Sequence, residues 1–467
     1  MSKKEVTNVN SLHKSRTRCF RYIALFSSLL VMCSVSFMTE QKVIIINGMQ
    51  NVHSQPRVAT MPGSSDPSGD EWPMFHRGLN HTGATSTTPV ENTGPIWKFK
   101  TAGAVYSSPA IVGGRIYIGS TDGKVYCLNS NTGELVWSYT TINSLPVYSS
   151  PAVADGRVYV GCMDNRTYCL DAQTGTLIWI FVTGYSMDYS SPAVSGGRTY
   201  IASNDMKIYC LNAINGSQVW NYTSDFLVES SPAIWDGRVY VGSMNYKTIC
   251  LNASTGTLIW TFATGCGWTS PVASDDGRLF IAGGNNTLCC LNAITNKTFW
   301  SCSTYPFHTS TPCSTPTIAN GRVFEASSTD NRIYCFDALN GSRFAWFMEA
   351  SETFLSSPAI SNDRLYSVCN DGNLYCYNDT NGKKLWNYSI GKASHASFMH
   401  SSPAIVNGCV YVGSDDGYIY CFPMILNGSS SDSTIIVIVI IICSSGAILV
   451  VGITIVTRKQ RLHLKRS

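Results

Sequence analysis

The stretch YCLDAQTGTLIW, Tyr168–Trp179, reads as two short strands around a turn. Apolar residues run up to Asp171, polar residues through Gly175 reverse the chain, and Leu-Ile-Trp begins a second strand. Near-copies occupy 126–137 (YCLNSNTGELVW), 209–220 (YCLNAINGSQVW) and 249–260 (ICLNASTGTLIW). A unit that recurs at nearly constant spacing is typical of a repeat architecture.

Three series of residues extend this repeat along the chain. The tryptophans are Trp97, Trp137, Trp179, Trp220, Trp260, Trp300, Trp346 and Trp386, spaced by 40, 42, 41, 40, 40, 46 and 40 residues. The prolines, mostly within SSPA, are Pro109, Pro151, Pro192, Pro232, Pro271, Pro316, Pro358 and Pro403. The cysteines are Cys127, Cys169, Cys210, Cys250, Cys290, Cys335, Cys376 and Cys421. With four strand-like segments per unit (SSPAIV, RIYIGS, KVYCLN and ELVWSYT in the first), the pattern predicts an all-β, eight-bladed β-propeller of four-stranded blades.

The two ends of the repeat complement each other. The last unit (401–423) has three strand segments and no tryptophan strand after them, whereas the first tryptophan strand (95–101) has no strands before it. We therefore expect the N-terminal strand to complete the last blade and close the ring, which removes exposed sheet edges.

Each repeated residue has a structural interpretation. Proline cannot donate to a sheet ladder, so it suits the edge strand that faces the central channel. The tryptophans of the outermost strands are expected to pack between neighbouring blades. The cysteines are expected to fill tight apolar slots rather than to form disulfides with one another.

Charge is concentrated at the chain ends. Residues 1–38 hold six Lys/Arg and one acid, and residues 458–467 hold five Lys/Arg and no acid, which leaves 33 − 11 = 22 basic and 29 − 1 = 28 acidic groups between them. This mildly acidic body, with a net charge of about −6 by that subtraction, does not suit nucleic acid, whose phosphates demand a basic surface.

Two apolar segments indicate a membrane. Residues 1–38 read as a signal peptide or an N-terminal membrane segment. Residues 434–457 lack any charge and are long enough for a transmembrane helix, and the basic tail 458–467 follows as expected on the cytoplasmic side. We therefore expect a cell-membrane protein with a lead-in segment (39–89, partly disordered), a propeller outside the cytoplasm (90–424) and a short stalk (425–433).

Potential glycosylation sites agree with that placement. Asn-X-Ser/Thr begins at Asn80, Asn165, Asn215, Asn221, Asn252, Asn285, Asn296, Asn340, Asn378, Asn387 and Asn427.

The repeat resembles the pyrroloquinoline-quinone (PQQ) repeat, whose pattern is roughly small-X-Asp/Asn-Ala-X-Thr-Gly-X-X-X-Trp. The matching residues are Cys169, Asp171, Ala172, Thr174, Gly175 and Trp179, with cysteine at the small position. The resemblance runs from about Trp72 to Pro423 and includes the lead-in EWPMFHRGLNHTGATS (Glu71–Ser86).

This resemblance implies a fold more clearly than a function. The same repeat builds PQQ-dependent dehydrogenases, a non-enzymatic outer-membrane assembly lipoprotein and many cell-surface propellers. In the dehydrogenases it implies a calcium ion, a catalytic aspartate and a vicinal disulfide stacked on PQQ. The chain has one adjacent pair, Cys289-Cys290, but Cys290 belongs to the repeated series, and no motif identifies calcium ligands or any catalytic residue.

Positions that vary between repeats point to a candidate binding site. The residues before SSPA are Tyr106, Tyr148, Tyr189, Glu229, Trp268, Cys313, Leu355 and His400, with Asp188 one step earlier. The aromatic residues together with Asp188, Glu229 and His400 suit a glycan, peptide or protein ligand at the channel mouth. The alternative is that these side chains only plug the channel.

Two longer loops lie on the same expected face. The first contains Cys302 and Cys313, which an oxidising compartment would allow to form a disulfide. The histidines of the two loops, His308, His395 and His400, match no metal-ligand spacing, so we expect no metal site.

Two functions remain open. The first, which we favour, is a membrane-anchored binding or scaffolding propeller that has no cofactor and is not an enzyme, because no catalytic motif is found. The alternative is a dehydrogenase that depends on PQQ and calcium.

Overall fold

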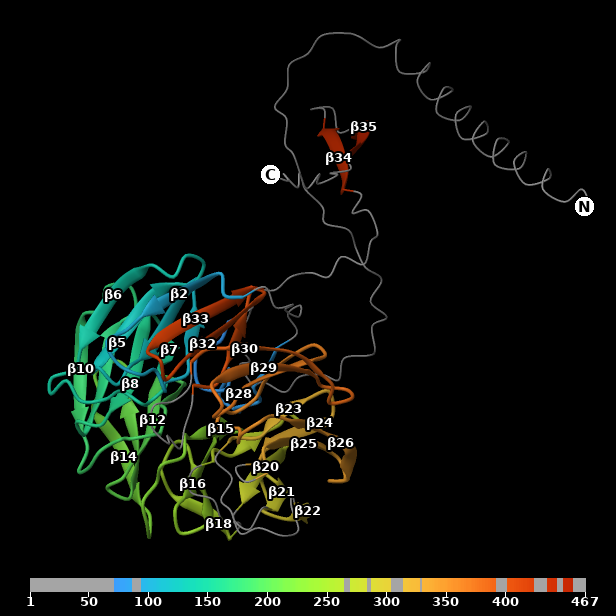
Figure 1. Cartoon of the computed structure of the whole chain (residues 1–467). Coiled ribbons are helices and arrows are strands. Elements are labelled where there is room, and N and C mark those ends of the chain that lie inside the picture. Colours follow the sequence, from blue (N-terminus) through green and yellow to red (C-terminus); the bar gives the residue numbers. More distant parts are fainter. Residues whose placement is uncertain are drawn as a thin grey trace, which may run out of the picture. The chain divides into compact units, whose positions relative to one another are not determined.

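The computed structural model describes residues 71–85, 94–263, 269–283, 287–303, 314–327, 330–391 and 401–423, and the backbone of 435–442 and 448–456. Residues 59–427 form one compact unit and the remaining residues of the two ends form another. The described residues of the first unit are an all-β ring of eight four-stranded blades, as the repeat predicts (Figure 1).

The four strands of every blade pair antiparallel; in blades 1 to 7 they follow one another in chain order, and in blade 8 the N-terminal β2 takes the fourth place. The first strands of blades 1 to 8 are β3 (Ala110–Val112), β7 (Ala152–Ala154), β11 (Ala193–Ser195), β15 (Ala233–Trp235), β19 (Val272–Ala273), β23 (Thr317–Ala319), β27 (Ala359–Ser361) and β31 (Ala404–Val406). The second strands are β4 (Arg115–Gly119), β8 (Arg157–Cys162), β12 (Arg198–Ser203), β16 (Arg238–Ser243), β20 (Arg278–Gly283), β24 (Arg322–Ala326), β28 (Arg364–Val368) and β32 (Cys409–Gly413).

The outer half of each blade follows the same order. The third strands are β5 (Lys124–Asn129), β9 (Arg166–Asp171), β13 (Lys207–Asn212), β17 (Lys247–Asn252), β21 (Thr287–Asn292), β25 (Arg332–Asp337), β29 (Asn373–Asn378) and β33 (Tyr418–Pro423). The fourth strands are β6 (Leu135–Thr140), β10 (Leu177–Val182), β14 (Gln218–Thr223), β18 (Leu258–Ala263), β22 (Thr298–Ser303), β26 (Arg343–Glu349), β30 (Lys384–Ser389) and, for blade 8, β2 (Trp97–Lys100).

The N-terminal strand closes the ring, and this prediction is confirmed. β2 pairs antiparallel with β33, and Trp97 lies opposite Cys421 (Figure 1). The two ends of the repeat therefore meet in one sheet, and β2 covers the edge that β33 would otherwise leave open.

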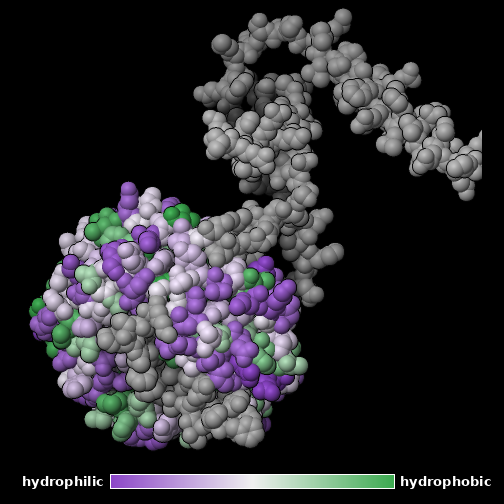
Figure 2. Space-filling view, viewed as in Figure 1, coloured by the Kyte–Doolittle hydropathy of each residue, from purple (hydrophilic) through white to green (hydrophobic). Residues whose placement is uncertain are grey.

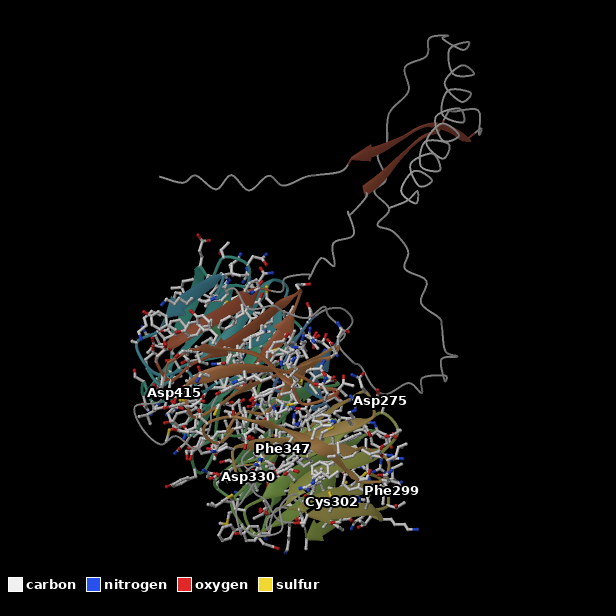
Figure 3. The ribbon with its side chains drawn as sticks, turned by 45° about the vertical axis from the view of Figure 1, so that its right-hand side comes forward. Asp275, Phe299, Cys302, Asp330, Phe347 and Asp415 are labelled. Atoms are coloured by element: carbon white, nitrogen blue, oxygen red, sulfur yellow. The ribbon has the colours of Figure 1, made fainter. Side chains whose placement is uncertain are left out.

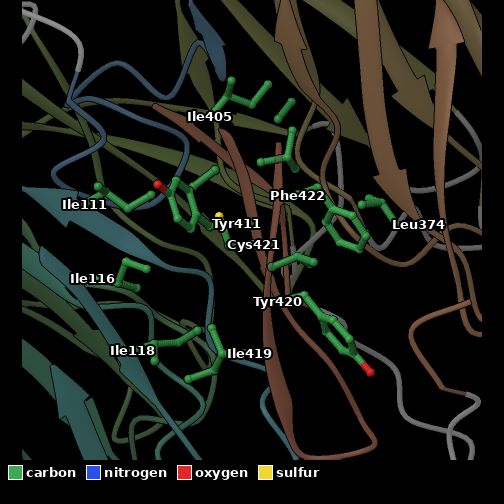
Figure 4. Packing of buried hydrophobic residues seen from close by; sticks show 14 of the residues in the cluster. Ile111, Ile116, Ile118, Leu374, Ile405, Tyr411, Ile419, Tyr420, Cys421 and Phe422 are labelled. Carbon is green, nitrogen blue, oxygen red and sulfur yellow. The ribbon is translucent and has the colours of Figure 1, made fainter. Parts of the chain in front are cut away.

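The hydrophobic core lies between the blades. Second and third strands are buried on both faces, which explains their continuous apolar runs, whereas fourth strands alternate between exposed and buried residues. The largest cluster surrounds blade 8 and includes Ile116, Leu374, Ile405 and Phe422, from blades 1, 7 and 8 (Figure 4).

The tryptophans pack between blades, as expected, and the turn glycine explains their position. The Trp137 indole donates from Nε1 to the carbonyl of Ala172 in the next blade at 3.1 Å. Gly175, with φ of 73°, lies under that indole, and a Cβ there would approach the ring to 2.6 Å. The Ala-X-X-Gly part of YCLDAQTGTLIW thus packs against the tryptophan of the preceding blade, and Trp179 at its end packs against the same turn of the following blade.

The helix expected over 434–457 is a wrong prediction. The structure has β34 (Ile435–Ile442) and β35 (Ile448–Val456), an antiparallel pair in which Ile435 lies opposite Val456. Isoleucine and valine fill much of both strands, and β-branched side chains favour the extended conformation. Within the part of the chain that the structure describes, no helix is long and apolar enough to cross a membrane.

Candidate functional site

A closed circle of hydrogen bonds surrounds the central channel. In every blade the backbone N–H of the second Ser of SSPA, or of its equivalent, donates to the hydroxyl of the same residue in the next blade. The eight residues are Ser108, Ser150, Ser191, Ser231, Ser270, Thr315, Ser357 and Ser402, with distances between 2.9 and 3.2 Å, and Ser402 donates back to Ser108. All eight side chains are buried, so the circle fixes the width of the channel.

The lead-in segment 71–85 runs around the other end of the first strands, and we call it the strap. Its backbone bonds in turn to blades 1, 2, 4, 5, 6 and 7. For example, Trp72 exchanges two hydrogen bonds with Ile111, and the Leu79 carbonyl accepts from Ile234 at 2.7 Å. The strap ends in β1 (Ala84–Thr85), which pairs parallel with β27.

Aromatic side chains of the strap lie beneath the channel. Phe75 stacks on His76 with ring centroids 4.8 Å apart and contacts His81 edge-on. Burial lowers the pKa of His76 to about 4 and that of His81 to about 3, so both imidazoles are neutral at physiological pH. The strap therefore adds a hydrophobic floor beneath the channel, and its two buried imidazoles add no charge there.

The predicted tyrosines form a continuous arc at the channel mouth. The ring centroids of Tyr106 and Tyr148 are 5.7 Å apart, and those of Tyr148 and Tyr189 are 5.6 Å apart with nearly parallel planes. Each ring comes from a different blade, so the hydroxyl circle just below them sets their spacing. The structure thus brings together three of the residues that the sequence selected.

The two predicted carboxylates lie beside this arc. Asp188 accepts a hydrogen bond from Asn204 Nδ2 at 2.9 Å through Oδ2, while its Oδ1 is buried and has no partner in the structure. Burial, with help from Tyr148 and the two carboxylates Asp188 and Glu229, raises the pKa of Tyr189 to about 12. The described mouth is therefore aromatic and acidic.

The channel below the mouth is narrow. The space among the tyrosines, Glu229, Leu355, the hydroxyl circle and Phe75 is about 30 Å³. That is room for about two water molecules, so a ligand can rest on the arc or insert one small group, but it cannot enter whole.

Below the mouth, the described residues do not fit the cofactors of the dehydrogenases. PQQ has three fused rings, which exceed the space between the arc and Phe75. Calcium takes six to eight oxygen ligands, and the described residues contain no group of three His, Cys, Asp or Glu placed to hold a metal ion. Cys289 and Cys290 point into two different inter-blade clusters, and neither is part of a disulfide.

Some predicted residues fall outside the described part of the chain, namely Trp268, His400, Cys313, Asn285 and Asn427. Cys302 is half-buried in β22, where its thiol donates to the Leu288 carbonyl at 3.7 Å (Figure 3). The disulfide between Cys302 and Cys313 stays a prediction.

The predicted glycosylation sites differ in exposure. Four asparagines are exposed: Asn215, Asn221, Asn340 and Asn387. Five are partly buried: Asn80, Asn165, Asn252, Asn296 and Asn378. Among the latter, Asn252 accepts two backbone N–H bonds in its turn, a structural use of the repeated Asp/Asn position.

Sequence reasoning missed a larger cavity at the opposite end of the first strands. It measures about 330 Å³ and lies between blades 3, 4 and 5, lined by Arg198, Trp235, Asp236, Asp275 and strap residue Asn80 among others (Figure 3 labels Asp275). Trp235 was the available signal, because the last position of the other first strands holds a small or aliphatic residue such as Val112, Ala154 or Ser195.

The comparisons with known proteins agree with this architecture. The family model described as "Outer membrane protein assembly factor BamB" matches residues 90–253 and 247–451. The chain belongs to this family of PQQ-repeat propellers. No curated protein matches the chain.

Solved structures share the fold at low sequence identity. BamB from Moraxella catarrhalis is 17% identical with a TM-score of 0.60, covering 71% of this chain and 99% of BamB. Quinohemoprotein alcohol dehydrogenase from Comamonas testosteroni is 15% identical (TM-score 0.64; 78% and 82% covered), and a europium-containing methanol dehydrogenase is 13% identical (TM-score 0.66; 77% and 99% covered). At these identities the likeness concerns the fold alone.

Proposed function

We propose that this BamB-family chain is a non-catalytic scaffolding propeller, held at a membrane with its ring outside the cytoplasm, whose channel mouth binds a basic side chain of a protein partner. The observation that carries the proposal is the pair of carboxylates beside the tyrosine arc: Glu229 lines the space at the mouth, and Asp188 next to it has a buried Oδ1 without a partner in the structure. A buried acceptor without a partner is costly, and a guanidinium or ammonium group would satisfy it.

The shape and charge of the mouth support this choice of ligand. Tyrosine faces attract cations, and Glu229 adds a second carboxylate next to Tyr189. The narrow space admits the charged end of one side chain rather than a whole sugar ring. A rigid rim that accepts one protruding residue suits a scaffold whose partner is a folded protein or a peptide.

Binding is tested with the full chain in detergent micelles and fluorescent peptides whose central residue, flanked by Gly and Ser, is arginine, lysine or citrulline. We expect anisotropy to report binding of the two basic peptides, roughly tenfold or more weakening with citrulline, and further weakening with salt. Asp188→Asn and Glu229→Gln should each reduce affinity. Glu134→Gln, which alters an exposed carboxylate at the opposite face, is the matched control.

Two outcomes would overturn the binding site. Equal affinity for the arginine and citrulline peptides would remove the role of the carboxylates. Binding of a glycan panel instead of peptides would assign the mouth to carbohydrate. Dye-linked alcohol oxidation after addition of PQQ and calcium would favour the dehydrogenase alternative.

The proposed membrane attachment rests on sequence alone, namely the uncharged composition of 434–457 and the basic tail after it, because β34 and β35 take the place of the expected helix in this stretch. We expect the full chain to stay in the membrane fraction after alkaline carbonate extraction and a chain ending at residue 433 to be released. Loss of apparent mass after removal of N-glycans would support the placement of the ring outside the cytoplasm. Retention of the shortened chain would contradict this anchor.

A further inference from the structure

One position in the second strand separates blade 8 from the rest of the ring. Blades 1 to 7 begin this strand with arginine: Arg115, Arg157, Arg198, Arg238, Arg278, Arg322 and Arg364. Blade 8 begins it with Cys409. Because the eight blades share one backbone structure, a thiol in blade 8 takes the position that a guanidinium occupies in the other seven.

The arginine lies next to the repeated strand cysteine. In blade 1, burial raises the pKa of Cys127 to about 12, and the adjacent Arg115 guanidinium, which is hydrogen-bonded to the thiol, opposes the rise. The same neighbours occur in blade 3, with Arg198 and Cys210, and in blade 5, with Arg278 and Cys290.

The arginine also joins neighbouring blades. Arg115 Nη1 donates to the carbonyls of Ala172 and Gln173 in blade 2, at 3.0 and 2.9 Å. A cysteine cannot replace these bonds, so the substitution in blade 8 forgoes an interaction that the scaffold uses elsewhere.

In blade 8 the exchange places two thiols side by side. Tyr411 lies opposite Cys421 in the register of β32 and β33, and Cys409 lies opposite Pro423, so the two cysteines are diagonal neighbours on adjacent strands (Figure 4 labels Tyr411 and Cys421). The Cys421 thiol is hydrogen-bonded to Cys409, and this bond together with burial holds the pKa of Cys421 above its usual value. Cys421 is fully buried, whereas Cys409 is partly exposed.

We propose that Cys409 and Cys421 are a redox pair that forms a cross-strand disulfide between β32 and β33, and thereby staples the blade that closes the ring. The oxidant is a small disulfide such as oxidised glutathione. The Cys409 thiolate attacks it and releases one glutathione thiol. Cys421 then displaces the second glutathione from Cys409, so that two protein thiols become one disulfide while one glutathione disulfide becomes two thiols.

The bond would act on ring closure through β33. This strand also pairs with the N-terminal strand β2, where Trp97 lies opposite Cys421, and Trp97 Nε1 donates to Ser130 in blade 1 at 3.0 Å. A staple between β32 and β33 therefore limits the local opening from which β2 would detach. Diagonal neighbours on antiparallel strands are roughly 7–8 Å apart, and somewhat less between their Cβ atoms, whereas a relaxed disulfide spans about 4.4–6.8 Å between its Cα atoms. Closing the bond therefore requires β32 and β33 to move slightly toward each other at this point, and we expect mild reductants to break it.

The test uses the full chain in detergent micelles, equilibrated with oxidised or reduced glutathione. Remaining thiols are blocked with N-ethylmaleimide in acidic denaturant, and peptides are mapped by mass spectrometry without reduction. We expect a cross-linked peptide pair containing Cys409 and Cys421 after oxidation and its loss after reduction. The cysteines next to arginine, such as Cys127 and Cys376, should carry the maleimide in both samples.

Two variants separate this site from general cysteine oxidation. Cys409→Arg restores the residue of the other blades and should abolish the cross-link. Arg364→Cys creates the same diagonal pair in blade 7 and should generate a second cross-link, to Cys376. We also expect the thermal midpoint of the wild-type chain, but not of Cys409→Arg, to fall by a few degrees on reduction.

Full maleimide labelling of Cys409 and Cys421 after oxidation would overturn the proposal, as would a cross-link from Cys409 to a different cysteine. These readouts do not depend on peptide binding at the mouth, so the redox pair and the proposed function can fail separately.

Discussion

Two joints between blades, built from the same repeat, differ at the turn residue that faces the tryptophan. Between blades 2 and 3, Trp179 covers Gly216 and donates from Nε1 to the Ala213 carbonyl at 3.1 Å. Between blades 4 and 5, Trp260 meets a turn in which Asn296 replaces the glycine, and its Nε1 has no partner in the structure.

The rest of the second joint keeps the regular geometry. Tyr159 and Trp179 have ring centroids 5.8 Å apart, and Tyr240 and Trp260 have the same separation. The Asn296 amide donates instead to the Thr261 carbonyl at 3.2 Å. Packing is thus retained while the indole hydrogen bond is lost. The packing of the rings therefore positions the blades, and the hydrogen bond contributes further stability where it forms.

Removing each tryptophan should give the largest effect and test this comparison directly. We expect Trp179→Ala to reduce the free energy of unfolding by about 3–5 kcal/mol, because it leaves a large cavity and removes one of the two hydrogen bonds that the Ala213 carbonyl accepts, the other coming from the Tyr159 hydroxyl. Trp260→Ala should cost about 1 kcal/mol less, because no indole hydrogen bond is lost. Urea midpoints of the full chain followed by circular dichroism measure both. Equal losses would show that the bond is worthless at the regular joint.

A buried acid makes the neighbouring joint between blades 5 and 6 dependent on pH. Glu325 occupies the position of Ile118 in blade 1, and burial raises its pKa to about 8. The unfolded chain ionises this group near pH 4.5, whereas the ring keeps it protonated up to about pH 8. The contribution of Glu325 to the free energy of unfolding is therefore fully present below pH 4.5, falls as the pH rises from 4.5 to about 8, and changes no further above that.

Replacing the acid should flatten this dependence. We expect Glu325→Ile to stabilise the ring at pH 8 by an amount on the order of 3 kcal/mol and to leave it nearly unchanged at pH 4.5. Urea midpoints across this range measure the difference from the wild type, with Glu134→Gln as the exposed control. A difference that does not vary with pH would contradict the assignment.

The sequence predicted the ring because the decisive signals are periodic. Evenly spaced tryptophans and prolines identify blades, and the missing strand at each end identifies the closure that Trp97 and Cys421 confirm. The hydrophobic face of each strand also repeats, so the inter-blade position of the tryptophans followed from pattern alone.

Contacts between distant residues could not be read in this way. The SSPA motif was visible in the sequence. The hydrogen bond that its second hydroxyl accepts from a backbone N–H of the preceding blade could not be predicted, because it forms only in the closed ring. The course of the strap and the cavity beside Trp235 likewise arise from residues far apart in sequence. The segment 434–457 misled because an uncharged stretch of isoleucine and valine satisfies the length of a helix and the propensity of a strand equally well.

The turn residue itself distinguishes the two joints at a smaller scale. Gly216 has φ of 74°, and a Cβ there would lie 2.7 Å from the Trp179 ring, so Gly216→Ala should cost about 2 kcal/mol. Asn296 already carries a side chain at φ of 64°, so Asn296→Ala should cost no more than about 1 kcal/mol, mainly the bond to Thr261. The same urea midpoints rank the two, and a larger loss at Asn296 would reverse the comparison.

The hydroxyl circle gives the smallest expected difference, between its link from blade 2 to blade 3 and its link from blade 5 to blade 6. The Ser150 amide donates to Ser191 Oγ at 2.9 Å, whereas the Ser270 amide donates to Thr315 Oγ1 at 3.2 Å, the longest link in the circle. We expect slower hydrogen exchange at the Ser150 amide than at the Ser270 amide, measured by mass spectrometry of overlapping peptides. Ser191→Ala should cost about 1 kcal/mol and abolish the difference by leaving the Ser150 amide without an acceptor. Because hydrogen exchange reports how often each link opens, faster exchange at the Ser150 amide in the wild type would contradict this prediction. It would show that the ring opens first between blades 2 and 3.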